Sequence, residues 1–263
     1  MKQATMTGFL DVFTSGRTRP ILIEANEADG TSRVLVAKLT GRQFDKGALT
    51  RELVASKLAM YFGLDTPVPF LLNIPPNYQE LNLPADVELA IQNGFFPTFA
   101  TEYIRFLPAF TPDRKLHERH VPLATEIFTF DALIVNRDRT EYGSVNCLTD
   151  STRFVLLDHE TALDDRLIGT GSYMEPWLQG SLSAMTNLLK HIFFDSISGQ
   201  GCDFEPIRAK WLALDQAQVD VLLADVPAVW DDENRALQAI RTYLRRLVEN
   251  LSGALDEVQE VLR

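Results

Sequence analysis

Three oxygen-bearing side chains occur close together in the segment IVNRDRTEYGSVNCLTDSTRFVLLDHETAL, residues 134–163. They are Asp138 in NRDR, Asn146 in SVNCL, and Asp158 directly after RFVLL. A carboxylate such as Asp138 can accept or orient the proton of an attacking hydroxyl group. The amide oxygen of Asn146 and the carboxylate of Asp158 are hard ligands of the kind that Mg²⁺ prefers. SVNCL and RFVLL read as two short strands around TDST, and a hairpin would bring these side chains together.

Each of these residues also has a simpler explanation. Asp138 could be an ordinary loop acid paired to Arg137 or Arg139, and Asn146 could close a local turn. Asn is uncommon in strands, however, so its presence in SVNCL needs a reason. The prediction of a reactive site rests on the whole set.

A basic and an acidic candidate occur earlier in the chain. Lys38 ends the aliphatic strand VLVAKL, and strand alternation places it on the same face as Val34 and Val36. A charge on that face needs a partner, because burying it alone is costly. Glu52 lies within a stripe of small residues where the next helix meets the sheet. We expect a Lys38–Glu52 ion pair that holds the ammonium group toward a phosphate; the alternatives are a lysine that reaches solvent and a surface acid.

Together these residues predict phosphoryl transfer, which needs a cation on the phosphates, metal ligands and a group that orients the attacking hydroxyl. The elements that must position them follow from periodicity and turn signals. We predict a β-hairpin over 20–39, a helix over 46–62 that ends at Gly63, an extended segment over 65–75, a loop-rich stretch over 76–98, a strand over 99–104, a helix over 123–136, the hairpin of the candidate site, and a last helix over 233–262.

The order of elements predicts a two-lobed α+β protein with a cleft between the lobes. Strands and one helix come first, and mainly helices follow a link near residue 104. We therefore divide the chain into a β-rich N-lobe, 1–103, and a helical C-lobe, 104–263, that contains the small hairpin. The last helix carries an apolar stripe, so it packs on its own domain or, as an alternative, forms a coiled coil.

Composition restricts the classes of function. The chain has 263 residues, 46% hydrophobic and 23% charged, which is ordinary for a globular protein. No apolar run approaches the roughly 18 residues of a membrane span, and no signal peptide is recognisable. Cys147 and Cys202 are too few and too distant for a zinc site or a disulfide framework, so we expect a cytoplasmic protein. The net charge of −11 argues against nucleic-acid binding but leaves room for one nucleotide.

Four segments resemble the HipA-like kinase family, in particular its compact members. They are VLVAKL, RELVASKLAMYFGLDTPVP, FDALIVNRDRTEYGSVNCL and FVLLDHETAL. The resemblance covers most of residues 14–163 and is clearest at NRDR and LLDHETAL. That family is similar to the phosphatidylinositol kinases and, more distantly, to protein kinases. The resemblance implies a protein-kinase-like fold, ATP and Mg²⁺ as cofactors, Ser or Thr of a protein as acceptor, and a toxin–antitoxin setting with an antitoxin partner.

The resemblance also implies roles for individual residues. Lys38 would contact the nucleotide phosphates, and Glu52 would hold Lys38. Asp138 would be the catalytic acid/base, and Asn146 and Asp158 would bind Mg²⁺.

The nucleotide-binding roles fall on two further segments. The segment TSGRTRP, 14–20, with Gly16 as its only glycine, would cover the phosphates. The strand FATEYI would link the lobes, and the backbone groups of Glu102, Tyr103 and Ile104 would receive the adenine.

Some features depart from the family's pattern. Asn146 follows Asp138 by eight residues, whereas protein kinases place their asparagine five residues after the aspartate. Thr140 stands where family members often have His. An alternative is therefore a weak or inactive module that binds a nucleotide or a partner protein with the same fold. Another is a lipid or small-molecule kinase, because the fold does not determine the acceptor.

Overall fold

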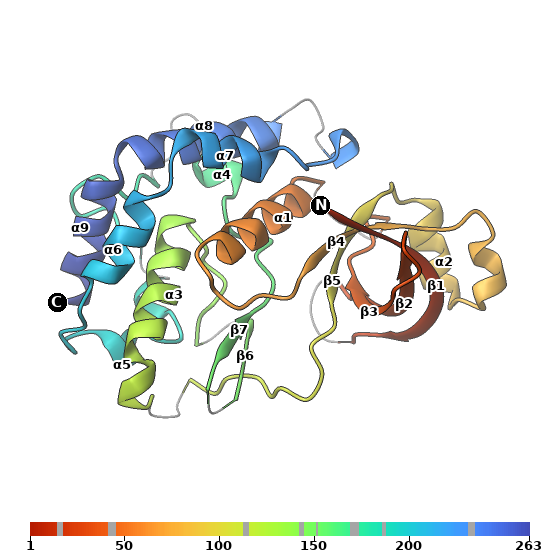
Figure 1. The fold of residues 1–263 in the computed structure, drawn as a ribbon, viewed down its shortest axis with the longest axis horizontal. Coiled ribbons are helices and arrows are strands. Elements are labelled where there is room, and N and C mark those ends of the chain that lie inside the picture. The colour runs from red at the N-terminus through yellow and green to blue at the C-terminus, as the bar shows by residue number, and fades with distance from the viewer. Residues whose placement is uncertain are drawn as a thin grey trace.

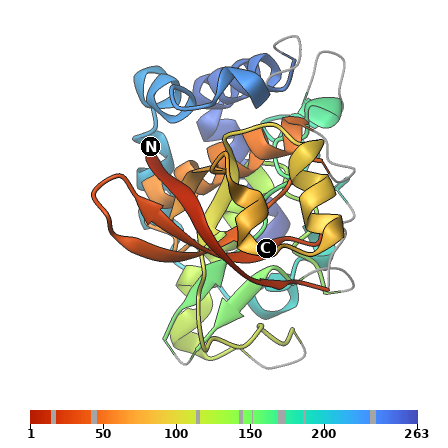
Figure 2. The ribbon, with the colours of Figure 1, turned by 90° about the vertical axis from the view of Figure 1, so that its right-hand side faces the viewer.

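A β-barrel and a group of helices lie side by side in the computed structural model, with α1 (Lys46–Tyr61) between them (Figure 1). Figure 2 turns the barrel toward the viewer and places most helices behind it. The structure describes residues 1–14, 18–41, 46–112, 116–141, 145–150, 152–168, 174–185, 188–230 and 235–263. Within these ranges, no helix combines the length and the apolar character that a bilayer crossing requires.

The barrel has five strands in the order β1-β2-β3-β5-β4. The strands are β1 (Lys2–Val12), β2 (Ile21–Glu27), β3 (Ser32–Ala37), β4 (Pro69–Asn73) and β5 (Thr98–Glu102). Neighbours pair antiparallel, except that β1 and β4 close the barrel as a parallel pair. Alternate residues point inward, as in Ile21, Ile23 and Ala25 of β2. The predicted hairpin and the strand near residue 99 are confirmed, but the sheet is a closed barrel and β1 was not predicted.

Helix α1 contacts both parts of the molecule because it is apolar on more than one side. Leu49 and Leu53 pack with Phe99 of β5, whereas Leu58 and Phe62 belong to the core of the helical part. The predicted end of the helix is confirmed, since Gly63 follows with a positive φ of 72°. Glu52 is therefore carried by an element anchored on both sides.

Helices dominate the rest of the chain, as predicted. The further elements are η1 (Tyr78–Leu81), α2 (Ala85–Gln92), η2 (Glu118–His120), α3 (Val121–Leu133), β6 (Cys147–Thr149), β7 (Phe154–Leu156), α4 (Asp165–Ile168), η3 (Leu188–Lys190), α5 (Phe194–Ile197), α6 (Glu205–Leu212), α7 (Gln216–Leu223), η4 (Ala228–Trp230), α8 (Arg235–Glu249) and α9 (Leu251–Leu262). Helix α3 and the antiparallel β6–β7 hairpin confirm the predicted elements around the candidate site. The stretch 76–98 contains η1 and α2, which were not predicted.

The prediction of one long last helix is wrong. The chain bends at Asn250, which separates α8 from α9, and the Asn250 side chain donates to the Arg246 carbonyl at 2.8 Å. Figure 1 shows the two helices running in different directions. Leu247 and Leu255 on either side of the bend are both buried in the helical core. The apolar stripe therefore packs on its own domain, as expected, but around a corner.

Candidate active site

A pocket of about 480 Å³ lies between the barrel, α1 and the β6–β7 hairpin. Its lining includes Val36, Lys38, Glu52, Phe99, Glu102, Tyr103, Ile104, Asn146, Leu148, Leu156, Asp158 and His159. Most of the residues singled out from the sequence thus line one cavity, although they come from opposite ends of a stretch of more than a hundred residues. Gly16 lies outside the described residues.

Lys38 is the centre of the site and is buried. Its Nζ donates to Glu52 Oε2 at 3.1 Å, to Asp158 Oδ1 at 2.7 Å and to Glu160 Oε2 at 3.2 Å. The predicted Lys38–Glu52 ion pair is therefore present, and the alternative of a lysine that reaches solvent is wrong. The contact with Asp158 connects the barrel to the end of the hairpin.

The charges in this cluster are strongly interdependent. Burial on its own would lower the pKa of Lys38, but attraction to Glu52, Asp158 and Glu160 raises it well above its usual value. Burial, with repulsion from Asp158, raises the pKa of Glu52 to about 7, although Lys38 acts to lower it. Burial also acts to raise the pKa of Asp158, but Lys38 outweighs it and lowers that pKa. The cluster carries excess negative charge, which suits a divalent cation.

Asn146 and Asp158, the predicted metal ligands, flank the hairpin in unusual backbone conformations. Their φ angles are 46° and 51°, in the left-handed region that non-glycine residues seldom adopt. Strain of this kind is concentrated at functional sites. Asn146 Nδ2 donates to Asp138 Oδ2 at 3.0 Å, which directs the amide oxygen away from Asp138 and leaves it suited to ligate a cation.

Asp138 does not line the pocket itself, but it accepts a hydrogen bond from Asn146, which does. Burial and repulsion from Asp158 raise its pKa above the ordinary value of a carboxyl group. The alternative of an ordinary loop pair with Arg139 is wrong, because Arg139 Nε donates to Asp131 Oδ2 at 2.7 Å. A carboxylate with a raised pKa beside a candidate metal site is suited to accept a proton.

The protein side chains can supply some of the ligands of Mg²⁺, and a bound nucleotide would supply others. Among the described residues, no three His, Cys, Asp or Glu side chains form a complete metal site. Mg²⁺ commonly takes one or two protein ligands and completes its shell with water and substrate phosphates. Asp158 and Asn146 supply that number.

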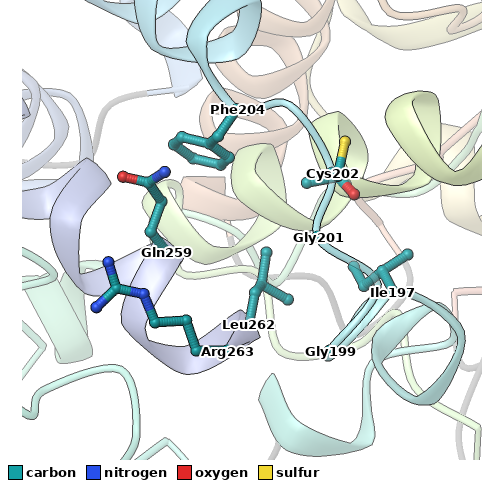
Figure 3. A pocket seen from close by; sticks show the side chains of 9 residues that line it. Ile197, Gly199, Gly201, Cys202, Phe204, Gln259, Leu262 and Arg263 are labelled. Carbon is teal, nitrogen blue, oxygen red and sulfur yellow. The ribbon is translucent and has the colours of Figure 1, made fainter.

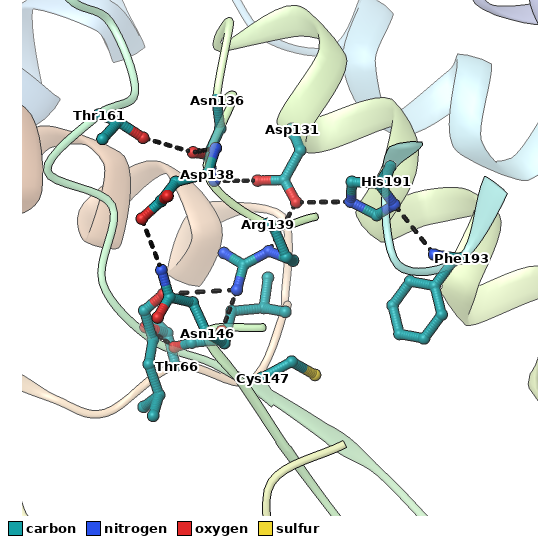
Figure 4. A network of polar contacts seen from close by, with 12 residues as sticks. Thr66, Asp131, Asn136, Asp138, Arg139, Asn146, Cys147, Thr161, His191 and Phe193 are labelled. Atoms are coloured by element: carbon teal, nitrogen blue, oxygen red, sulfur yellow. Dashed lines mark hydrogen bonds and ion pairs between the residues drawn. The ribbon is translucent and has the colours of Figure 1, made fainter. Parts of the chain in front are cut away.

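A buried polar network holds the loop that carries Asp138 (Figure 4). Asp131 of α3 accepts from Arg139 Nε at 2.7 Å and Asn136 Nδ2 at 2.7 Å, and it contacts His191 Nε2 at 3.0 Å. Arg139 also donates to the carbonyl of Asn146. The network thus joins α3, the Asp138 loop and the hairpin strand, so that the two predicted functional residues Asp138 and Asn146 share one support.

The segment expected to receive adenine has one free amide donor. The N–H groups of Glu102 and Tyr103 donate to the carbonyls of Val68 and Val34 at 3.0 and 2.9 Å. Ile104 N–H makes no hydrogen bond within the described part of the chain. Of the three amides, the geometry therefore leaves that of Ile104 for a ligand.

Sequence reasoning missed Glu160, Asp131 and Arg139. Two signals were present. Glu160 is a second acid only two residues after Asp158, close enough in sequence to share its surroundings. Asp131 is a lone acid in the apolar part of its helix, where burial requires a cationic partner.

The side chain of His159 forms no hydrogen bond with the described residues. Its ring is buried against Phe130, and neither ring nitrogen has a partner among the described residues. Burial lowers its pKa to about 3, so the ring is neutral. Only its backbone N–H is engaged, with Glu52 Oε2 at 2.9 Å.

A His159→Phe variant is expected to be more stable by about 1 kcal/mol at pH 7, because two unsatisfied buried nitrogens are removed. In the wild type, His159 binds a proton near pH 6.5 when the chain is unfolded but only near pH 3 when it is folded. The free energy of unfolding therefore falls as pH drops from about 6.5 toward 3. The variant should lose this contribution to acid sensitivity. Urea unfolding at pH 7 and pH 5 measures both effects. His117→Phe, at an exposed site, is the control; a His159→Phe variant less stable than wild type would contradict the expectation.

A second pocket shares no lining residue with this site. It is lined by the 197–204 segment and the end of α9, with Phe204, Gln259 and Leu262 around it (Figure 3). None of the residues singled out for phosphoryl transfer contributes to it.

Comparisons with known proteins bear on the family and the fold of the chain. The sequence matches the HipA-like kinase family over residues 8–175. The crystal structure of the Helicobacter pylori proinflammatory kinase CtkA matches with a TM-score of 0.53 and 13% identity, over 96% of this chain and 97% of CtkA. The Rio2 kinase from Chaetomium thermophilum matches at 13% identity over 96% of this chain and 72% of Rio2, and its TM-score of 0.39 is too low to indicate a shared fold. No curated protein sequence matches the chain.

Proposed function

The chain belongs to the HipA-like kinase family, and from this premise we propose that it is an ATP- and Mg²⁺-dependent kinase that phosphorylates a hydroxyl group, most simply Ser or Thr of a protein. One observation carries the proposal. Lys38 of the barrel side and Asp158 of the hairpin meet at 2.7 Å in a pocket that also contains Asn146 and the free amide of Ile104. In the proposed reaction these groups would serve as a cation for phosphates, as metal ligands and as a donor to adenine, which supports the proposal.

We assign the following roles. Ile104 N–H receives the adenine, and Lys38, held by Glu52, binds phosphate oxygens. Asp158 and Asn146 hold Mg²⁺, which would neutralise charge on the phosphates.

Asp138 orients the acceptor hydroxyl and takes its proton. The acceptor oxygen then forms a bond to the γ-phosphorus as the bond from that phosphorus to the ADP oxygen breaks, and ADP leaves. The raised pKa of Asp138 favours this proton transfer.

We further propose that 1–103 and 104–263 act as two lobes on either side of the nucleotide, with α1 as the element that contacts both. The family also suggests a setting with an antitoxin partner, in the cytoplasm, where ATP is available. The antitoxin partner and the cytoplasmic location concern the biological context and do not alter the chemistry of the site.

Purified protein incubated with γ-labelled ATP and Mg²⁺ is expected to label itself or a protein in a lysate. Addition of EDTA, which removes the metal, should reduce labelling by at least a hundredfold. The Asp158→Asn substitution should do the same, because the metal loses its carboxylate ligand. Thermal unfolding would verify that Asp158→Asn is folded. Asp195→Asn, at an exposed position of α5, is the matched control and should label normally. Binding of ATP with no transfer under any condition would contradict kinase activity and favour a nucleotide-binding module.

A further inference from the structure

Lys38 has no N–H left for a nucleotide. An ammonium group has three N–H donors, and Lys38 directs them to three carboxylates, Glu52, Asp158 and Glu160, at 2.7 to 3.2 Å. A phosphate oxygen can therefore bind Lys38 only by replacing one of these three acceptors. Which one is replaced determines what the other two do.

The accessible acceptor is Asp158. Its side chain is 33% exposed, compared with 3% for Glu52 and 11% for Glu160. Asp158 also lines the pocket through which a nucleotide would enter, whereas Glu160 is not part of the lining. The contact between Lys38 and Asp158 Oδ1 thus marks the direction from which a phosphate oxygen would approach.

Glu160 lies on a segment that is fixed at successive residues. The backbone N–H of His159 donates to Glu52 Oε2 at 2.9 Å, and Arg51 Nε donates to the Glu160 carbonyl at 2.7 Å. Thr161 Oγ1 donates to Asn136 Oδ1 at 3.0 Å, in the loop that carries the proposed base. Arg51 is itself buried and is the neighbour of Glu52 in α1. One helix therefore contacts Lys38 directly through Glu52 and anchors the backbone of Glu160 through Arg51.

We propose that Glu160 is a second positioning carboxylate for Lys38, which together with Glu52 fixes two of its N–H groups and directs the third toward a nucleotide phosphate. The proposal rests on the proposed function. The sequence suggested that Glu52 alone holds Lys38, whereas here Glu52 and Glu160 hold it together. Asp158 is then released from Lys38 to serve the metal, without loss of order at the ammonium group.

The test compares a ligand that has phosphates with one that lacks them. Isothermal titration of Glu160→Ala should show MgADP binding weakened about tenfold, because Lys38 loses one charged acceptor and its fixed direction. Binding of adenosine, which does not reach Lys38, should be unchanged. Glu160→Gln keeps an acceptor oxygen and should recover most of the MgADP affinity. Glu118→Ala, an exposed glutamate of η2, is the control.

Three results would overturn the proposal. Equal weakening of adenosine and MgADP in both variants would indicate a structural role for Glu160. Unchanged or tighter MgADP binding would indicate that Glu160 is dispensable or opposes the phosphates. If wild type binds neither ligand, the proposed function itself fails, and this outcome is distinct from the first two.

Discussion

An Asp138→Asn variant is expected to lose about a thousandfold in kcat while it binds MgADP as wild type does, because general-base catalysis contributes on this scale. Asp138 accepts a hydrogen bond from Asn146 at 3.0 Å, and an amide oxygen at position 138 can still accept it. The variant therefore keeps the site's geometry and removes only the proton acceptor. Single-turnover transfer from labelled ATP, together with calorimetric MgADP binding, separates the two effects.

The pH profile gives an independent measurement. Burial raises the pKa of Asp138, and it raises that of Glu52 to about 7. Wild-type activity should therefore rise with pH toward neutrality as these carboxyl groups ionise. The residual activity of Asp138→Asn should keep only the part of this rise that comes from Glu52. Full activity in Asp138→Asn would show that the acceptor's proton is taken elsewhere.

Local patterns were sufficient to predict the central ion pair. Lys38 directly follows β3 and shares a face with the apolar residues Val34 and Val36, and Glu52 interrupts a stripe of small residues, so each charge required the other. The pair is present at 3.1 Å. The elements around the site were also predicted from local patterns, with β2, β3 and the β6–β7 hairpin read from aliphatic runs beside turn residues, and α1 and α3 from apolar segments of helical length.

Features that depend on tertiary contacts could not be predicted. Strand β1 buries small or flexible residues such as Ala4 and Met6 between polar neighbours, and only its parallel pairing with β4 closes the barrel. The bend at Asn250 leaves the apolar period unchanged on both sides, so periodicity does not reveal it. Glu160 reaches Lys38 across 122 residues, and its closeness to Asp158 in sequence does not by itself show that both contact this lysine.

The second strong prediction concerns stability. An Asp131→Ala variant is expected to lose about 3–5 kcal/mol of unfolding free energy, because it leaves the fully buried Arg139 without its counter-ion. Burial acts to raise the pKa of Asp131, but Arg139 and His191 outweigh it and lower that pKa well below the ordinary value. The contribution is therefore complete above about pH 4, the unfolded value, and is lost as pH falls further. Urea unfolding at pH 7 measures the loss.

A double variant distinguishes the effect of losing the ion pair from the effect of losing side-chain volume. Asp131→Leu with Arg139→Met replaces both charges by apolar groups and should be clearly more stable than Asp131→Ala, because no buried charge remains unpaired. It should nevertheless transfer phosphate poorly, since Arg139 also donates to the backbone of Asn146 and helps to hold the Asp138 loop. If Asp131→Ala costs less than about 1 kcal/mol, the network does not support the fold. If the double variant keeps full activity, the Asp138 loop is positioned by other contacts, such as the hydrogen bond from Thr161 to Asn136.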